Sequence, residues 1–169
     1  QIEYMALRGI AKAVPKEDIT SKKIQVIIAD MKTAMTSQED GVAIAGPQIG
    51  ANFRIFIISD EILKKADEEY RSIGRDLVFI NPKITKLSRA KHDAEEGCLS
   101  VRWKYGKVKR SVKAVIEGYN ELGEKVVRGA SGLLAQIFQH ENDHLDGILF
   151  TDKAYDITDI PPEKLRKED

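Results

Sequence analysis

The sequence predicts an α+β domain, and two observations lead to this prediction. Apolar residues recur at the 3.6-residue spacing of an amphipathic helix in one segment near the start of the chain and in another near its end. Short apolar or alternating runs typical of β-strands lie between these two segments. Several strands with one helix early and another late are typical of an α+β domain.

The early helix is predicted over residues 21–37, where its apolar face comprises Ile24, Ile27, Ile28, Met31 and Met35. Thr20 or Ser21 can cap its first turn. A glycine-containing loop over residues 41–50 follows, and then a buried strand over residues 54–59.

The middle of the chain alternates between strands and polar segments. Residues 60–76 are polar, and we expect them to form a surface excursion. Residues 77–80 are predicted as a strand that Asn81 and Pro82 interrupt. Two alternating runs over residues 108–127 flank the sequence Asn-Glu-Leu-Gly at 120–123, which indicates a β-hairpin.

The late helix is predicted from Ser131, which can cap it, to about Leu145, with Gly147 where a helix would stop. Residues 152–169 are polar and contain two adjacent prolines, so we expect a loose C-terminal tail. The chain is therefore predicted as a single domain over residues 1–151 followed by that tail.

The composition is that of a globular protein with 42% hydrophobic and 32% charged residues in a chain of 169. Its formal net charge of zero gives no general reason to expect nucleic-acid or membrane binding, and the longest apolar runs are too short to span a bilayer. A single cysteine and the lack of a signal-like N-terminal pattern favour the cytoplasm. No coiled-coil pattern or obvious interface stripe is present, so we expect a monomer.

Two of the three histidines, His140 and His144, are four residues apart on the late helix. Positions i and i+4 share one face, so both imidazoles can reach one metal ion, and Glu141 can then act on a metal-bound water. Leu133 and Ile137 lie on the same broad face, so the ligands adjoin the core. The alternative is a helix that carries two histidines without binding a metal.

A catalytic zinc-type centre needs three protein ligands and one open position. Cys98 is the best third candidate, because the neighbouring Gly97 allows a close backbone approach and a metal would explain a lone thiolate among many acids. The alternative for Cys98 is a small buried hydrophobic residue. His92 lies in a charged run, and we expect it to be a solvated surface residue.

Three segments, residues 41–48, 96–100 and 140–144, together resemble the peptide deformylases. In that family a glycine- and alanine-rich loop ending in glutamine, a Glu-Gly-Cys-Leu-Ser segment and a His-Glu-x-Asp-His motif occur in this order. The resemblance covers roughly residues 41–152. It implies small antiparallel or mixed β-sheets packed around a central C-terminal metal-binding helix, with an N-terminal helix.

The resemblance implies removal of the N-formyl group from the initiator methionine of nascent polypeptides, with release of formate. Cys98, His140 and His144 would bind one divalent metal ion, with Fe(II) expected in cells and zinc, nickel or cobalt possible in purified protein. A metal-bound hydroxide would attack the formyl carbon. Glu141 would act as general base and then as general acid.

The remaining site residues are expected around the formyl-methionyl group. The Gln48 side-chain amide and the Leu99 backbone N–H would bind the developing oxyanion. The methionine side chain would lie against Val42, Leu133 and Ile137, with Gln136 at the edge of that pocket. The peptide would pair, as an added strand, with the backbone of Val42, Ala43 and Ile44.

The sequence departs from the family pattern in the loop over residues 41–48 and after Ser100, where Arg102 stands in place of the more usual proline or glycine. The family normally has glycine where Ala43 stands and alanine where Gly46 stands, and Ala43 would be strained if its position needed a positive φ. Trp103 either forms a wall of the substrate groove or is a partly buried strand residue. The basic run over residues 102–113 either contacts ribosomal RNA or forms a solvated strand face.

Two other functions are compatible with parts of this pattern. A zinc endopeptidase of the His-Glu-x-x-His type uses a third ligand downstream of the helix, whereas the best third ligand here lies upstream and is a thiol. A deformylase-like binding module for acylated N-termini would be expected to lack the base or a ligand. Glu141, Gln48, Cys98 and both histidines are all present.

Overall fold

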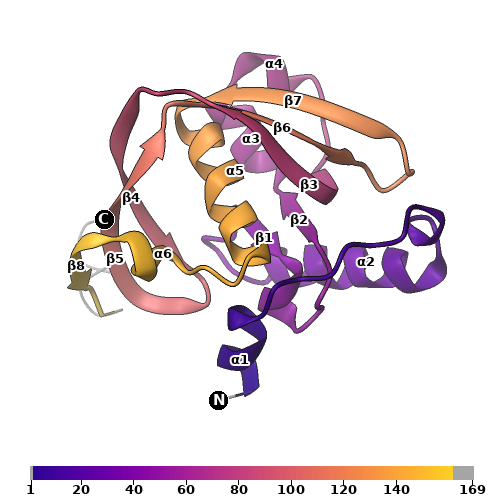
Figure 1. Cartoon of the computed structure of the whole chain (residues 1–169), viewed down its shortest axis with the longest axis horizontal. Helices are drawn as coiled ribbons and strands as arrows, with labels where there is room; N and C mark the ends of the chain where they lie inside the picture. Colours follow the sequence, from indigo (N-terminus) through magenta and orange to yellow (C-terminus); the bar gives the residue numbers. More distant parts are fainter. Residues whose placement is uncertain (1, 162–169) are drawn as a thin grey trace.

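The computed structural model describes residues 2–161 and contains two antiparallel β-sheets with a long helix, α5, between them. In Figure 1, α5 runs through the middle of the molecule. The larger sheet has the strand order β1-β2-β3-β6-β7 and the smaller has the order β4-β5-β8. The elements are α1 (Ile2–Arg8), η1 (Lys16–Asp18), α2 (Lys22–Thr36), β1 (Ala43–Ala45), η2 (Gly46–Ile49), β2 (Ile55–Ile58), α3 (Asp60–Ala66), α4 (Glu68–Arg71), β3 (Leu77–Leu87), β4 (Lys91–Cys98), β5 (Val101–Ser111), β6 (Lys113–Tyr119), β7 (Lys125–Ser131), α5 (Gly132–Leu145), α6 (Phe150–Lys153) and β8 (Tyr155–Asp159).

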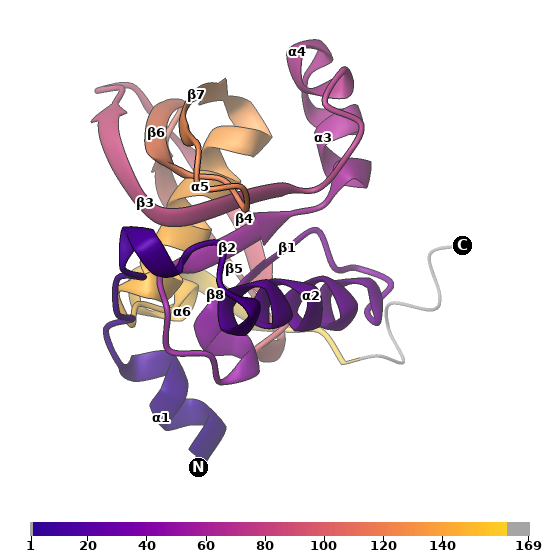
Figure 2. The same ribbon diagram turned by 90° about the vertical axis from the view of Figure 1, so that its right-hand side faces the viewer.

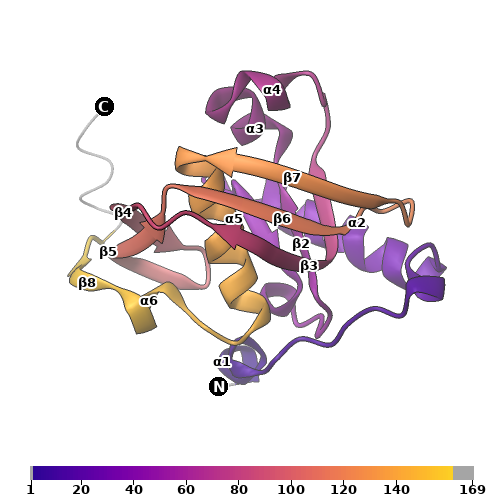
Figure 3. The ribbon, with the colours of Figure 1, turned by 45° about the horizontal axis from the view of Figure 1, so that its top comes forward.

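The predicted α+β class, with sheets around a central helix, is confirmed. Strands β3, β6 and β7 lie side by side across α5 (Figure 3). The predicted hairpin is present as β6 and β7, which are joined by a turn that contains Gly123 with a φ of 79°. Within residues 2–161 no helix combines the length and apolar character needed to cross a membrane.

Strands β1 and β2 and the first part of β3, residues 77–80, are apolar because a helix covers each face of this part of the sheet. Phe56 and Phe79 pack with Phe138 of α5, with successive ring centroids 5.0 and 5.5 Å apart. Alternate residues such as Ile57 and Val78 point to the opposite face and pack with α2. Figure 2 shows α2 beside β1 and β2 on this side of the sheet. A strand buried on both faces needs apolar residues at every position, which explains the unbroken apolar sequence of β2.

The two predicted helices form at the expected places. α2 begins after Ser21, whose side chain accepts a hydrogen bond from the Ile24 N–H at 3.4 Å. α5 begins after Ser131, but the Ser131 side chain makes no capping hydrogen bond, contrary to prediction. Gly147 follows the end of α5 with a φ of 73°, and a Cβ there would lie 2.5 Å from the Arg8 carbonyl oxygen. Glycine is therefore required at this turn.

The polar segment over residues 60–76 is more ordered than predicted. It contains α3 and α4, which bury Leu63 and Tyr70 against the core around α5. The Tyr70 hydroxyl donates a hydrogen bond to the Gly129 carbonyl at 2.7 Å. Ile62, Ala66 and Ile73 are partly buried against the same core, so apolar contacts hold a segment whose other residues are mostly polar.

Asn81 and Pro82 do not end a strand, because β3 continues through them to Leu87. Asn81 has a φ of 51°, and the register between β3 and β6 shifts at this point. The Asn81 side chain accepts from the Val14 N–H at 2.8 Å and donates to the Val14 carbonyl at 2.7 Å. The dipeptide therefore forms a bulge that ties the N-terminal segment to the sheet.

The expected loose tail is wrong for residues 155–159. These residues form β8, which pairs antiparallel with β5 and places Asp159 opposite Lys104. All five residues are exposed, so the strand is held by backbone pairing and leaves no hydrophobic pattern in the sequence. Residues 162–169 of the expected tail lie outside the described part of the chain. The division into a domain over residues 1–151 and a tail stays a prediction.

Candidate metal centre and active site

The three side chains predicted as metal ligands lie together where β4 ends beside α5. Cys98 is the last residue of β4, and His140 and His144 are one turn apart on α5. The Cys98 Sγ lies 3.3 Å from His144 Nε2, and one donor atom of each residue lies within 4.8 Å of the other two. Among residues 2–161, no other three His, Cys, Asp or Glu side chains form such a group.

This donor set fits a divalent transition-metal ion. Sulfur and nitrogen ligands on one tetrahedral zinc-type ion lie roughly 3.6 Å apart, given typical bond lengths of ~2.3 and ~2.05 Å. The 3.3 Å between Cys98 and His144 is close to that separation. One thiolate and two imidazoles suit zinc, iron, cobalt or nickel, and three protein ligands leave a position open for a reactant.

Glu96, which the sequence did not mark as a site residue, fixes the orientation of His140. Its Oε2 lies 2.9 Å from His140 Nδ1, and Glu96 is only 5% exposed. This contact leaves Nε2 of the ring free for a metal ion. The two-residue alternation of a strand places Glu96 on the same face of β4 as Cys98, and that pattern is the signal that would have found it.

A buried arginine compensates the charge of Glu96. The Arg110 Nε and Nη2 donate to Glu96 at 2.7 and 3.0 Å, and Nη1 donates to Asp143 at 2.7 Å. Lys153 of α6 pairs with Asp143 at 3.0 Å. Burial alone would raise the pKa of Glu96, but the hydrogen bonds from His140 and Arg110 outweigh it and lower that pKa to about 2. Glu96 therefore stays ionised beside His140.

The basic run over residues 102–113 is solvated only in part, because one of its arginines is buried. Arg110 is 3% exposed and belongs to the centre described above. Three exposed lysines of β5 pair with acidic residues within the chain: Lys104 with Asp159, Lys107 with Asp156 and Lys109 with Asp93. This internal pairing favours a solvated strand face over an RNA-binding strip for the remainder of the run.

The two histidines differ strongly in proton affinity. Burial would lower the pKa of His140, but hydrogen bonds with Cys98 and Glu96 outweigh it and raise that pKa to about 10. Burial, reinforced by the nearby charge on His140, lowers the pKa of His144 to about 3. In the metal-free protein one ring is therefore protonated, and a cation that binds here displaces that proton.

Glu141 lies beside the three donors without being one of them. It follows His140 on α5, and its Oε1 lies 3.9 Å from His140 Nε2. Glu141 is 5% exposed, and its Oε2 is buried without a hydrogen-bond partner. Burial raises the pKa of Glu141 to about 7. A carboxyl group with such a pKa can both accept and return a proton near neutral pH.

Gln48 is held with its amide nitrogen toward the metal ligands. Its Oε1 accepts from the Ala45 N–H at 2.8 Å, which orients the Nε2 toward Ser100 Oγ at 3.0 Å and Cys98 Sγ at 3.7 Å. Leu99 lies in the turn between β4 and β5 and lines the same cavity. Both predicted oxyanion donors therefore come from segments next to Cys98.

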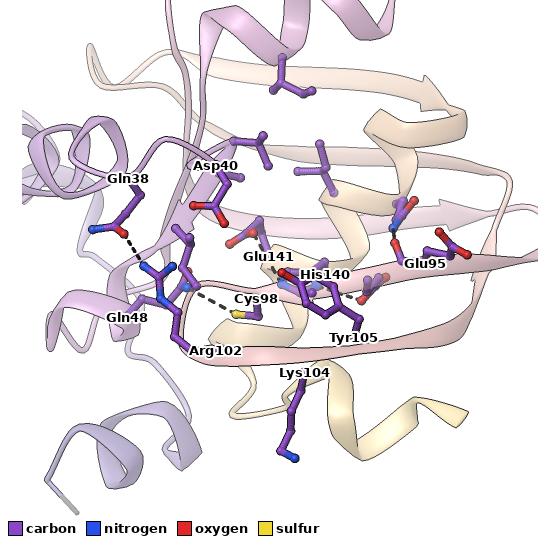
Figure 4. A pocket seen from close by; sticks show the side chains of 18 of the residues that line it. Gln38, Asp40, Gln48, Glu95, Cys98, Arg102, Lys104, Tyr105, His140 and Glu141 are labelled. Atoms are coloured by element: carbon purple, nitrogen blue, oxygen red, sulfur yellow. Dashed lines mark hydrogen bonds and ion pairs between the residues drawn. The ribbon is translucent and has the colours of Figure 1, made fainter. Parts of the chain in front are cut away.

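A cavity of about 810 Å³ opens onto these residues. Figure 4 shows Cys98, His140 and Glu141 at its centre, with Gln48 on one side and Glu95 on the other. Apolar side chains line one part of the wall: Val42, Ile62, Leu133 and Ile137. Gln136 also lines the cavity and donates to the Glu95 carbonyl at 2.9 Å.

The expected substrate-binding loop is only partly directed at the cavity. Val42 and Ala43 line it, but Ile44 is 4% exposed and packs on the α2 side of the sheet. The side chain of Ile44 therefore does not contact a ligand in the cavity, and only its backbone remains a candidate. β1 is an edge strand, paired with β2 on one side only, so its other edge can accept a peptide.

The two unusual loop residues are accommodated without strain. Ala43 is an ordinary strand residue without a positive φ, so the steric penalty considered for this position does not arise. A Cβ on Gly46 would lie 2.8 Å from the Ala51 carbonyl oxygen and 2.9 Å from that of Phe53. Gly46 therefore allows a close approach of two backbone segments beneath Gln48.

The structure agrees with one interpretation of Trp103 but not with the prediction for His92. Trp103 lines the cavity and is 38% exposed, in agreement with a role as a groove wall. His92 is only partly exposed and its Nδ1 is buried without a partner, so the prediction of a solvated residue is wrong. It faces the same side of β4 as Glu96 but lies outside the group of metal donors.

Known proteins that resemble this chain in sequence are peptide deformylases. A family model described as polypeptide deformylase matches residues 1–159. Peptide deformylase 2 of Clostridium acetobutylicum is 40% identical over 136 residues, which are 80% of this chain and 81% of the relative. Peptide deformylase of Fusobacterium nucleatum is 40% identical over 149 residues, which cover 87% of this chain and 77% of the relative.

Solved structures agree with the fold. A peptide deformylase of Synechococcus elongatus in complex with actinonin superposes with a TM-score of 0.75 at 34% identity, over 89% of this chain and 76% of that one. A Met-Ala-Ser-bound peptide deformylase of Acinetobacter baumannii gives a TM-score of 0.76 at 31% identity, over 88% and 91% of the two chains.

Proposed function

The chain belongs to the peptide deformylase family, whose members remove the N-formyl group from nascent peptides, and we propose that Cys98, His140 and His144 hold the divalent metal ion of this reaction. The observation that carries the proposal is the meeting of these three donors within 4.8 Å of one another, next to the cavity that Cys98, His140 and Glu141 line. The protein is thus a hydrolase of protein biosynthesis that acts at the N-terminal methionine.

The protein prepares its ligands before an ion binds. Glu96 and Arg110 fix the His140 ring, and the depressed pKa of His144 keeps that ring neutral and able to coordinate. When bound, a divalent ion lowers the pKa of a water molecule and polarises a carbonyl oxygen, as Lewis acids do. Fe(II) is proposed as the ion in cells, and zinc, nickel or cobalt in protein purified in air.

Glu141 carries the proton of the reaction. In its ionised form it accepts the proton that the attacking water loses, and in its protonated form it returns that proton to the amine that leaves. Its buried position and its pKa of about 7 support both roles, since either form is accessible near neutral pH. Formate and a free methionine amine are the products.

The developing negative charge on the formyl oxygen needs donors that are already oriented. The Gln48 Nε2 is fixed by the bond from Ala45 to its carbonyl oxygen, and it faces the metal donors. The Leu99 backbone N–H is proposed as the second donor. Removing one such donor typically costs ~3–4 kcal/mol of transition-state stabilisation.

The methionine side chain is proposed to occupy the apolar wall formed by Val42, Leu133 and Ile137, with Gln136 at its edge. Val42 and Leu133 are 42% and 47% exposed, so each offers apolar surface that a ligand can cover. The peptide main chain is proposed to pair with the free edge of β1 through the backbone of Val42, Ala43 and Ile44.

The two competing functions have less support. A binding module without activity would need no buried base, whereas Glu141 is buried beside the donors with one oxygen unpartnered. A zinc endopeptidase would need its third ligand downstream of α5, whereas Cys98 comes from β4. Formyl-methionyl nascent peptides are therefore the proposed substrates.

The protein is proposed to act in the cytoplasm as a monomer. A reducing compartment keeps the single Cys98 available as a thiolate ligand. Contact with the ribosome is compatible with a substrate that is still being synthesised, and no specific recognition of nucleic acid is proposed.

The direct test is an assay of formate release. Protein prepared without oxygen and loaded with Fe(II) is incubated with formyl-Met-Ala-Ser, and wild type is compared with Glu141→Gln. We expect formate from the wild type alone, with equal metal content in both proteins. Formate release by Glu141→Gln at the wild-type rate would remove Glu141 from its proposed role, and no release by the wild type would favour the binding module.

A further inference from the structure

Three residues of β5, Arg102, Trp103 and Lys104, form a bulge at the mouth of the cavity, which we call the rim segment. In the register of β4 and β5 these three residues have no partner on β4. All three line the cavity, although none of them contacts a predicted metal ligand through a hydrogen bond or ion pair. Bulges next to active sites commonly redirect side chains.

The rim segment is held in an unfavourable backbone conformation. Trp103 has a φ of 67°, in the left-handed region that favours glycine. The C-terminal strand supports it from behind, because the Ile160 N–H donates to the Trp103 carbonyl at 2.8 Å and Lys104 pairs with Asp159 at 2.8 Å. A strained bulge with two dedicated supports indicates a functional position for its side chains.

Arg102 reaches from the rim segment across the mouth of the cavity. Its guanidinium donates a hydrogen bond to the side-chain carbonyl of Gln38, in the turn after α2 (Figure 4). The guanidinium also lies over the Trp103 ring, 5.9 Å from the ring centroid. Within the described residues Arg102 forms no ion pair. Its acceptor is therefore a neutral carboxamide oxygen, which is chemically the same as a peptide carbonyl.

We propose that Arg102 is a substrate-binding residue that exchanges the Gln38 carbonyl for a main-chain carbonyl of the peptide beyond methionine, and that β8 positions it for this contact. The inference rests on the proposed function. The cavity extends from the metal donors to Arg102, so a peptide whose first residue is at the metal centre can reach the rim segment. Recognition of a main-chain carbonyl does not depend on sequence, which suits an enzyme that processes many different nascent chains.

The exchange predicts opposite effects for the two partners. Kinetics would compare formyl-Met-Ala-Ser with formyl-methionine amide, which has no residues beyond methionine. The ratio used is kcat/KM for formyl-Met-Ala-Ser divided by kcat/KM for formyl-methionine amide. In Arg102→Ala this ratio should fall about five-fold, mainly because KM for formyl-Met-Ala-Ser rises, as expected for loss of one exposed charge-assisted hydrogen bond. Gln38→Ala removes the competing acceptor and should raise the ratio. Gln38→Glu adds a competing ion pair and should lower it.

Arg89→Ala is the matched control, because Arg89 is an exposed arginine in the turn between β3 and β4 that does not line the cavity. The ratio should keep its wild-type value in this variant. An Arg102→Ala ratio equal to that of wild type, or Gln38→Ala and Arg102→Ala effects of the same sign, would overturn the proposal.

A binding measurement separates this proposal from the proposed function. Trp103 is the only tryptophan of the chain, so its fluorescence reports on the rim segment. In zinc-loaded Glu141→Gln protein, titration with formyl-Met-Ala-Ser should change the emission, and adding Arg102→Ala should weaken the fitted affinity about five-fold. An unchanged affinity would contradict the role of Arg102 even if the wild-type enzyme releases formate.

The support from β8 is tested in the same way. Asp159→Asn removes the ion pair to Lys104 and should weaken peptide binding about two-fold, within the range for an exposed pair. Asp156→Asn is the control on the same strand, because Asp156 faces Lys107, outside the cavity, at 4.0 Å. Equal affinities in these two variants would show that β8 does not position the rim segment.

Discussion

Replacing Glu96 with glutamine should weaken both the fold and the metal centre, because one buried carboxylate serves both. The pKa of Glu96 falls from 4.5 to about 2 in the folded protein, chiefly because the bonds from His140 and Arg110 outweigh burial. That difference corresponds to about 3 kcal/mol of stability at 1.36 kcal/mol per pKa unit. Because the folded-state pKa is depressed, this stability is present above pH 4.5 and is lost as the pH falls toward 2.

The loss of stability should therefore depend on pH. Urea unfolding of the metal-free protein should show Glu96→Gln less stable than wild type by up to about 3 kcal/mol at pH 7, with a smaller difference at pH 3.5. The His140 ring also loses its charged partner, so affinity for zinc should fall ~10–100-fold, as is typical when such outer contacts are removed. Competition with a chromogenic chelator measures that affinity.

Glu95→Gln is the natural control, because Glu95 is the exposed neighbour on β4 and makes no side-chain contact with the histidines. It should match wild type in both measurements. Equal stability at pH 7 and equal zinc affinity in Glu96→Gln and wild type would refute the argument that Glu96 orients His140 and that Arg110 stabilises its charge.

Other perturbations test neighbouring parts of the site. Cys98→Ala removes the only sulfur ligand and should lower zinc affinity by more than the ~10–100-fold of an outer contact; unchanged metal content after dialysis would point to another ligand. Gly46→Ala places a methyl group 2.8 and 2.9 Å from two carbonyl oxygens and should destabilise by ~1–3 kcal/mol, and an unaltered thermal midpoint would contradict that close approach. Since Glu141 must be ionised to accept a proton, and burial raises its pKa from 4.5 to about 7, kcat/KM for formate release should decline as the pH falls through this interval. A bound cation lowers the pKa of Glu141 and so moves the decline toward the lower end of this pH interval. A flat profile from pH 7 to 4.5 would exclude Glu141 as the base.

The metal donors on α5 could be predicted because their geometry is local. His140 and His144 share one face of a helix by spacing alone, and Glu141 is placed by being adjacent. Cys98 could be named from its glycine neighbour and from the family resemblance. Its distance from the histidines is set by how β4 lies against α5, which no local pattern encodes.

The charged residues behind the ligands could not be predicted in the same way. The β4–β5 register pairs Arg110 with His92 and Glu96 with Gly106, so strand pairing alone does not indicate that the Arg110 and Glu96 side chains meet at 2.7 Å. In the sequence Arg110 is one of several basic residues with the same alternation. Only the tertiary structure separates the buried arginine from the exposed lysines.

The C-terminal strand, β8, could not be predicted from the sequence for a different reason. All residues of β8 are exposed, so the strand forms through backbone pairing with β5 and shows no apolar face. The direction of the Ile44 side chain could not be predicted either, because an apolar side chain suits both a pocket and a core. The strand alternation of β1 directs it to α2.

The most direct test is an X-ray absorption spectrum of the protein loaded with one equivalent of zinc. A centre built from Cys98, His140 and His144 predicts one sulfur at about 2.3 Å and two imidazole nitrogens at about 2.0–2.1 Å around the ion. A coordination shell of nitrogen and oxygen alone, with no sulfur, would contradict the account.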